Sequence, residues 1–361
     1  MSEQNILEYK CPACGGTVSF DIHTQMMKCP YCESEFDVEA LKKHDADLNA
    51  EPKEDMKWDT DAGAEWRESD GDVVVFNCTS CGGEIIGEKT TAATFCPYCG
   101  ANVIVKGALS GSLKPDLVIP FKLDKQAAKQ AYSAHLKGKT LLPKLFKSEA
   151  TIDSVKGIYV PFWLYDCTAD ADVRFKATRT TSWSDSRNNY VKTDTYSVRR
   201  AGRVGFCGVP EDGSVKMDDA MMESIEPFDY SQAVDFQTAY LAGFFADKYD
   251  VTSADCAPRA NERIKNSTVE LLASTVTGYA SCTPEAVNIA TSNATVRYAL
   301  LPVWTLTVKY KGEDHFFAMN GQTGKLIGNL PVSRGKFWAF FTGIAAGVTA
   351  LGSVIVTLVL K

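Results

Sequence analysis

The sequence predicts an α+β fold with three parts: two small cysteine-bearing modules near the N-terminus, a central antiparallel α+β domain, and one C-terminal transmembrane helix. Three observations support this prediction. Four cysteines recur twice in one spacing, capped helical segments alternate with strand-like segments, and the 24 residues before Lys361 carry no charge. With 361 residues and 45% hydrophobic content, the chain is long enough for two or three domains.

Two copies of one cysteine frame lie within residues 1–40 and 72–106. Each copy reads C-x2-C-x14-C-x2-C, and the second repeats the first at an offset of 67 residues. Two intervening residues let both thiolates of a pair reach one ion, and fourteen residues suffice for a hairpin that returns the second pair to the first. The predicted metal ligands are Cys11, Cys14, Cys29, Cys32, Cys78, Cys81, Cys96 and Cys99.

This donor set predicts two zinc ribbons that each hold one structural Zn²⁺, two per chain. Four thiolates leave no coordination position for water, so neither ion should be catalytic. Iron remains an alternative, because rubredoxin-type sites use the same ligands. Disulfides need an oxidising compartment, and a thioredoxin-like site has a single C-x-x-C in a βαβ setting. Glycine follows Cys14, Cys81 and Cys99, where the chain must turn sharply, whereas Glu33 follows Cys32.

The charge of the two ribbons argues against nucleic acid as their partner. Residues 1–40 carry 2 bases and 7 acids, and residues 72–106 carry 2 bases and 3 acids. Duplex binding draws on Lys and Arg to displace counterions, so protein interaction is the expected role. Residues 41–71, with 10 acids and 5 bases, read as a flexible acidic linker. Four apolar residues could form contacts or mini-cores in the ribbons: Met27, Tyr31, Phe95 and Tyr98.

The central domain is expected to span residues 116–332. A helix should run from an N-cap at Asp124 to a stop at Gly138. Long alternating segments follow and predict antiparallel strands. A Pro-apolar-Trp segment occurs twice, at Pro161 to Trp163 and at Pro302 to Trp304, so the domain could be an internal duplication.

Residues 337–360 predict a membrane-spanning helix. As a helix these residues would extend about 36 Å, enough to cross a hydrocarbon core of about 30 Å. Arg334 and Lys336 precede the segment and favour a cytoplasmic location for the bulk of the chain. The prediction is therefore a single-pass protein of the cell membrane in contact with lipid. Gly343 and Gly347 could let two such helices touch and form a homo-oligomer.

The sequence contains none of the following common enzyme motifs. The four histidines do not form H-E-x-x-H, no G-x-S-x-G is present, and "NGQTGK" lacks the spacing of a phosphate-binding loop. Cys167, Cys207, Cys256 and Cys282 are scattered singly. The sequence therefore predicts that the chain is not an enzyme, and a catalytic central domain is kept as a third hypothesis.

The order of these segments resembles a known family. Two four-cysteine ribbons, "VIPFKLDKQAAKQAY", "GIYVPFWLYD", "YALLPVWTL", "NGQTGKLIGNLP" and an apolar terminal segment are similar to bacterial proteins described as containing a TFIIB-type zinc ribbon. Some of these are encoded beside phage-shock protein A and a flotillin-like (SPFH) protein. The resemblance implies a membrane-anchored adaptor that binds such protein partners during envelope stress.

The function expected from the sequence is thus a membrane-anchored zinc-ribbon adaptor or scaffold in a stress-response complex. The alternative is a membrane-tethered regulator that binds nucleic acid. Eight lysines within residues 113–147 favour this alternative, although the acidic ribbons argue against it.

Overall fold

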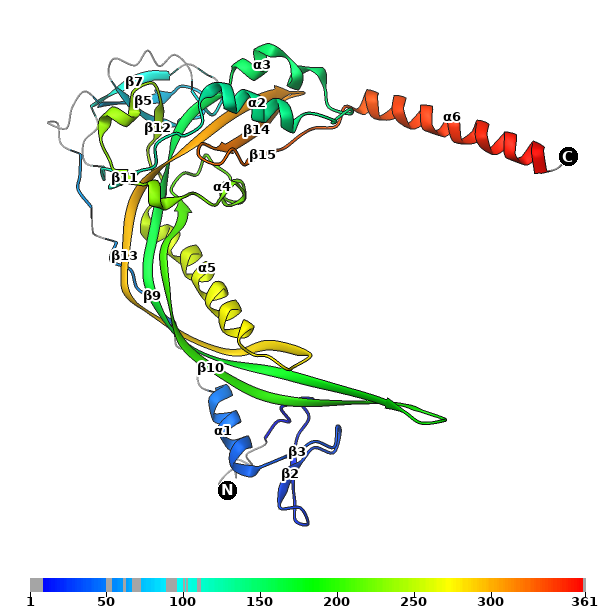
Figure 1. Cartoon of the computed structure of the whole chain (residues 1–361). Helices are drawn as coiled ribbons and strands as arrows, with labels where there is room; N and C mark the ends of the chain where they lie inside the picture. Colours follow the sequence, from blue (N-terminus) through cyan, green and yellow to red (C-terminus); the bar gives the residue numbers. More distant parts are fainter. Residues whose placement is uncertain are drawn as a thin grey trace, which may run out of the picture. The chain divides into compact units, whose positions relative to one another are not determined.

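The computed structural model describes residues 9–49, 54–60, 63–66, 73–88, 96–99, 101, 103–108 and 112–359. The chain divides into two compact units. Unit 1 comprises residues 1–60, 165–209 and 257–295, and unit 2 comprises residues 61–164, 210–256 and 296–361. Three long strands contribute residues to both units and are the longest ribbons in Figure 1: β9 (Lys156–Ser184), β10 (Asn189–Asp212) and β13 (Ser281–Tyr310).

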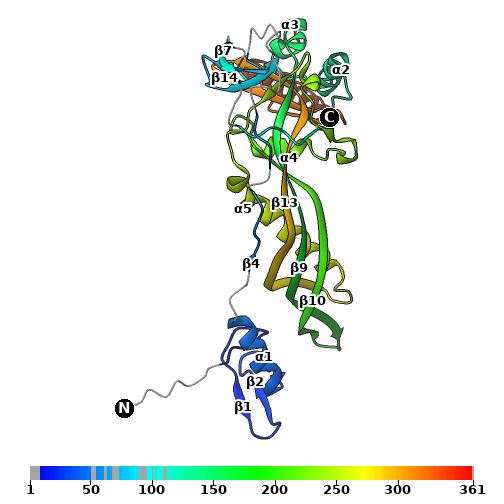
Figure 2. The same ribbon diagram turned by 90° about the vertical axis from the view of Figure 1, so that its left-hand side faces the viewer.

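Residues 9–49, here called module 1, hold a small antiparallel sheet and a helix (Figure 2). The sheet consists of β1 (Ser19–Asp21), β2 (Met26–Lys28) and β3 (Glu35–Phe36), in that order. The β1–β2 pair is the hairpin that the fourteen-residue spacing predicted. The helix α1 (Val38–Asn49) follows and extends into the predicted acidic linker. The Asp37 carboxylate accepts hydrogen bonds from the backbone N–H groups of Glu39 and Ala40, and so caps the helix.

The remaining described strands join one large sheet. Its order is β11-β8-β13-β9-β12-β6-β5-β7, with β10 on β9, β4 and β14 on β13, and β15 on β14. Besides the three long strands, its members are β4 (Glu54–Asp55), β5 (Val73–Cys78), β6 (Glu84–Glu88), β7 (Val103–Ala108), β8 (Leu117–Val118), β11 (Val234–Asp235), β12 (Phe245–Asp247), β14 (Glu313–Asn320) and β15 (Leu326–Gly328).

This sheet corrects the predicted fold class. The prediction was an antiparallel α+β domain, but the described part of the chain is mostly sheet and its large sheet is mixed. β12 runs parallel to β9, and β8 and β4 run parallel to β13. Alternation of apolar and polar residues along a strand reports which face is buried, and it contains no information about the direction of the neighbouring strand.

The helix predicted after Asp124 is α2 (Lys125–His135). The Asp124 carboxylate accepts from the Ala127 N–H at 2.8 Å, and Gly138 follows the helix with a φ of +79°, so the predicted start and stop are confirmed. The described helices after α1 are α2 (Lys125–His135), α3 (Glu149–Asp153), α4 (Asp219–Ile225), α5 (Ser253–Ser274) and α6 (Arg334–Val359), with 3₁₀ turns η2 (Lys144–Lys147), η3 (Tyr230–Gln232) and η4 (Thr238–Leu241).

Both predicted Pro-apolar-Trp segments lie in the buried core of unit 2. Trp163 on β9 donates its indole N–H to Val251 O at 2.9 Å, and Trp304 on β13 donates to Leu123 O at 3.0 Å. Buried tryptophans need such a partner, because an unpaired buried N–H is costly. Trp304 packs with Tyr132 of α2 and with Phe146 and Phe317 in one cluster. This packing holds α2 against the sheet.

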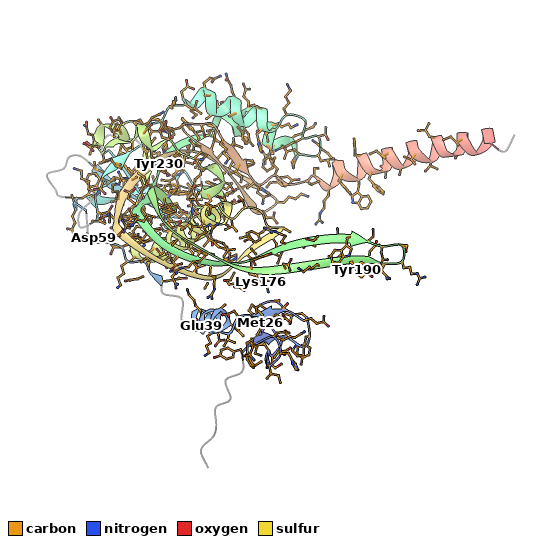
Figure 3. The ribbon with its side chains drawn as sticks, turned by 60° about the horizontal axis from the view of Figure 1, so that its bottom comes forward. Met26, Glu39, Asp59, Lys176, Tyr190 and Tyr230 are labelled. Carbon is orange, nitrogen blue, oxygen red and sulfur yellow. The ribbon has the colours of Figure 1, made fainter. Side chains whose placement is uncertain are left out.

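Unit 1 is built around the remaining parts of the long strands. Ala169, Val173 and Phe175 of β9 pack with Ile264 and Leu272 of α5. Figure 1 accordingly shows α5 beside β9 and β13. At the end of the β9–β10 hairpin, Trp183 and Tyr190 stack with ring centroids 5.5 Å apart, and Figure 3 shows Tyr190 far along this hairpin from Lys176.

The predicted transmembrane helix at residues 337–360 is not supported. Across the part of the chain that the structure describes, no helix combines the length and the apolar character needed to cross a membrane. The terminal helix α6 starts on Arg334 and carries three hydroxyl side chains, Thr342, Thr349 and Ser353, that donate to backbone carbonyls of the preceding turn. The predictions of a membrane-spanning anchor and of a single-pass membrane location are therefore wrong. The lipid contact and helix pairing expected from this anchor lose their basis.

Candidate metal centres

The four cysteines of the first frame converge within module 1, and we call this group centre 1. Their sulfur atoms all lie within 4.8 Å of one another. The Sγ–Sγ distance is 3.6 Å between Cys11 and Cys32 and 3.4 Å between Cys14 and Cys29. All four are free thiols, well beyond the S–S bond length of about 2.05 Å. A tetrahedral ion with metal–sulfur bonds of about 2.3 Å places sulfurs about 3.8 Å apart, so the donor set fits one metal ion.

Backbone hydrogen bonds close the turn that carries each cysteine pair of centre 1. Cys11 O accepts from the Gly15 N–H at 2.8 Å, and Cys29 O accepts from the Glu33 N–H at 3.0 Å. Gly15 and Glu33 have left-handed φ angles of 76° and 58°. Glycine adopts this conformation at no steric cost, whereas a residue with a Cβ does not. The missing glycine therefore leaves the turn intact but places the strain on Glu33.

The second frame forms an equivalent group, centre 2. The Sγ–Sγ distance is 3.5 Å between Cys78 and Cys99 and 3.7 Å between Cys81 and Cys96. The backbone N–H groups of Ser80 and Cys81 point to Cys78 Sγ at 3.5 Å each. Gly82 repeats the left-handed turn of Gly15 with a φ of 71°. Gly100, the third glycine of the predicted pattern, lies outside the described residues.

The thiols of each centre differ in acidity according to their surroundings. Burial raises the pKa of Cys11 to about 12. Hydrogen bonds from the Ser34 side chain and backbone lower the pKa of Cys32 to about 6. Burial opposes ionisation of Cys78, but the N–H groups of Cys81 and Ser80 outweigh it and lower the pKa to about 7. Each centre thus has one thiol that ionises readily, and a bound cation would replace the protons on the others.

The second glycine of each CGG sequence makes room for a side chain that crosses the turn. A Cβ on Gly16 would lie 2.5 Å from the Tyr31 ring, and a Cβ on Gly83 would lie 3.1 Å from Lys216 Cε. The same point at Gly83 is 3.5 Å from Cys81 Sγ. The covering residue therefore differs between the two centres: an aromatic ring from the same module in centre 1, and a lysine from a distant part of the chain in centre 2.

The two centres also differ in where their cysteine turns are buried. Cys78, Cys96 and Tyr98 belong to the main core of unit 2, together with Ile158 of β9 and Leu301 of β13. Tyr98 is 8% exposed, and its carbonyl oxygen accepts a hydrogen bond from the Thr307 hydroxyl. The matching residue of the first frame, Tyr31, is 76% exposed.

The four predicted ribbon contact residues therefore have different environments. Met27 packs against the small core of module 1. Tyr31 is exposed and Tyr98 is buried. Phe95 lies outside the described residues. Only Tyr31 of the three described residues offers most of its surface to a partner.

Two lysines near centre 2 had no signal in the cysteine spacing. Lys156 at the start of β9 donates from Nζ to Cys96 O at 3.2 Å. Lys216 contacts the carboxylates of Asp250, at 2.6 Å, and of Asp247, at 3.8 Å. Lys156 lies 60 positions from Cys96 along the sequence and Lys216 lies 135 positions from Cys81, so local patterns could not identify these lysines.

Asp247 is a fully buried carboxyl group. Its Oδ2 accepts from the Ser214 hydroxyl at 2.5 Å. Burial raises its pKa to about 6, although Lys216 and the Ser214 hydroxyl favour the ionised form and oppose that rise. Because the folded-state pKa exceeds the unfolded value of about 3.9, the protonated group stabilises the folded state. This stabilisation is complete below about pH 4 and is lost as pH rises through about 6.

The expected consequence is a pH-dependent stability difference between the natural chain and Asp247→Asn. Between pH 4 and pH 7 the unfolding free energy of the natural chain should fall by about 3 kcal/mol relative to the variant, because each pKa unit is worth about 1.4 kcal/mol. Urea unfolding of both proteins across this range measures the difference. Groups that both proteins share cancel in this comparison. A difference that stayed constant with pH would contradict the assigned shift.

Two of the single cysteines and several residues of the lysine-rich segment have structural roles within their own surroundings. Cys167 and Cys256 are buried, and burial raises the pKa of Cys167 to about 11. Both therefore behave as small apolar side chains. In the lysine-rich segment, Lys129 pairs with Asp153 at 2.7 Å, and Lys147 donates to Lys139 O at 3.1 Å. That the chain is not an enzyme stays a prediction from the sequence.

Two Cys₄ groups that could each hold a metal ion are thus present, as expected for a double ribbon. No family model matches the chain, and no solved structure matches it. A curated relative does: YdjG of Bacillus subtilis (strain 168), an uncharacterized protein, is 38% identical over 342 residues, which cover 95% of each chain. At this identity and coverage, the chain belongs to the same family as YdjG.

Proposed function

We propose that this chain is a non-enzymatic adaptor with two structural zinc ions, in which module 1 binds a protein partner. Zinc is the metal that suits a closed tetrahedral group of four thiolates in a structural site. The resemblance to double-ribbon proteins implies a phage-shock protein A-like partner within an envelope-stress complex.

One observation carries this proposal: module 1 exposes large apolar side chains. Phe20 and Ile22 at the β1–β2 turn are 48% and 71% exposed, and Tyr31 is 76% exposed. Figure 3 shows this module with Met26, the first residue of β2 after the turn. Exposed aromatic and aliphatic side chains on a small rigid scaffold are typical binding anchors.

The charge of module 1 indicates the kind of partner. Residues 9–49 carry seven acids and four bases, a net charge of −3. In the described module, Glu33 and Glu35 lie beside the second cysteine pair of centre 1. A complementary partner surface is therefore apolar at its centre and basic at its rim. This charge disfavours the nucleic-acid alternative for module 1.

The test is direct binding between the zinc-loaded full chain and a purified phage-shock protein A-like protein. Replacing Phe20 and Ile22 together by serine should weaken binding at least tenfold, because the loss of two interface anchors costs more than about 1.4 kcal/mol. Titration calorimetry measures this effect.

Val215→Ser is the matched control, since Val215 is also 71% exposed but lies in unit 2. This variant should bind normally. If the double variant binds as well as the natural chain does, module 1 is not the docking surface. If the natural chain shows no binding, the assigned partner is wrong.

A further inference from the structure

We infer that Lys216 and Lys156 are the counter-charges of centre 2, so that this centre retains its metal after centre 1 has released its own. The inference rests on the proposed assignment of zinc to both centres. It assigns different rates of metal release to two centres that have the same four ligands and the same spacing.

The charge at such a centre creates the need for counter-charges. Four thiolates and one Zn²⁺ carry a net charge of −2. Cys96 is fully buried and Cys78 is 3% exposed, whereas Cys99 is half-buried and Cys81 is exposed, so part of this charge lies within the core of unit 2. A buried charge is costly unless cations or hydrogen bonds compensate it. Groups that contact the ligands without binding the metal therefore influence how tightly the metal is held.

Lys216 supplies one compensating charge at the first cysteine pair of centre 2. Its stem lies against Gly83, beside Cys81 Sγ. Asp250 and Asp247 hold its ammonium group from the other side. The Lys216 ammonium group is thus ion-paired although the side chain is only 15% exposed.

Lys156 supplies the second charge, at the other cysteine pair. Its Nζ donates to the carbonyl oxygen of Cys96 at 3.2 Å. One lysine of the central sheet region thus faces each cysteine pair of centre 2, and both lysines are anchored in unit 2 with the centre itself.

Centre 1 has a different environment. Cys14 and Cys32 are exposed, whereas in centre 2 Cys81 is exposed and Cys99 is half-buried. Lys176 reaches its first cysteine pair, where Nζ donates to Ala13 O at 3.3 Å. At the second pair the neighbouring charged residues are Glu33, Glu35 and Lys28, and the Lys28 ammonium group pairs with the Glu35 carboxylate at 3.4 Å. Acidic neighbours disfavour a negatively charged centre. Centre 1 should therefore lose its metal first.

The experiment is zinc release from the fully loaded chain in excess chelator, followed with a metal-sensitive dye. Two phases of one zinc each are expected. Cys32→Ser should remove the fast phase, and Cys81→Ser should remove the slow phase. A single phase, or the opposite assignment, would overturn the inference. A chain that purifies without zinc would instead contradict the metal assignment in the proposed function.

The role of Lys216 is tested with a neutral residue of similar shape. Lys216→Met keeps an apolar stem over Gly83 and should accelerate the slow phase about tenfold or more, the usual effect of removing a group that supports metal ligands. Lys216→Arg should restore slow release, because charge and not shape is the requirement. Lys176→Met should leave the slow phase unchanged. If Lys216→Met folds poorly, Lys216→Gln gives the same comparison. An unchanged slow phase in the neutral variants would overturn the inference.

Discussion

Cys96→Ser is expected to destabilise unit 2 by at least about 3 kcal/mol, whereas Cys29→Ser should leave that unit unaffected. Both cysteines are fully buried, and each is the third ligand of its frame. Cys96 belongs to the core that contains β9 and β13, while Cys29 belongs to the small core of module 1. The free energy of metal binding is folding free energy for the part of the chain that forms the site.

The measurement combines metal content with unfolding. Each variant should bind one metal ion in place of two. Urea unfolding, followed by hydrogen exchange of the amides in β9 and β13, should show a lower midpoint only for Cys96→Ser. Equal effects of the two variants on these strands would contradict the finding that centre 2 is part of the core of unit 2.

Asn320→Ala is expected to cost about 4 kcal/mol, although the residue lies at a hairpin turn. Asn320 is fully buried, and its amide makes four hydrogen bonds. The Nδ2 group donates to Ile225 O at 3.0 Å and to Pro227 O at 3.1 Å. The Oδ1 atom accepts from the N–H groups of Gln322 at 2.8 Å and Thr323 at 3.0 Å. Removing the amide leaves these backbone groups without that partner, at about 1–3 kcal/mol for each buried group.

Asn188→Ala is the control for this prediction, because Asn188 is an exposed asparagine at the turn between β9 and β10. Its substitution should change the unfolding free energy by less than about 0.5 kcal/mol. Urea unfolding of both variants provides the comparison. Similar values for the two substitutions would show that the Asn320 amide does not join the β14–β15 turn to the segment after α4. The pattern "NGQTG" is typical of a turn between strands, but it does not indicate that this turn is buried.

The features that could be predicted from the sequence depend on the chemistry of neighbouring residues. The paired spacing of eight cysteines, the glycine after Cys14 and Cys81, and the cap at Asp124 each depend on atoms a few residues apart. Such features are fixed by bond geometry and backbone sterics, whatever the rest of the chain does. The structure accordingly brings together the four sulfurs of each frame.

One difference between the frames was present in the sequence in weak form. Val73 to Phe76 precede Cys78 as a continuous apolar run, and all four residues are buried. The residues before Cys11 are "LEYK". A continuous apolar run is typical of a strand covered on both faces, so it could have indicated that the second frame enters a larger sheet.

The sequence by itself determined two four-thiol groups, their turns and the two ends of α2, because these depend on neighbours along the chain. Only the tertiary structure decided the mixed direction of the large sheet, the incorporation of the second frame through the β6–β12 pairing, and the lysines beside it. The same physical reason applies to all three. Each depends on contacts between residues distant in sequence, and the free energy of burying apolar surface selects among pairings that local patterns leave equally open.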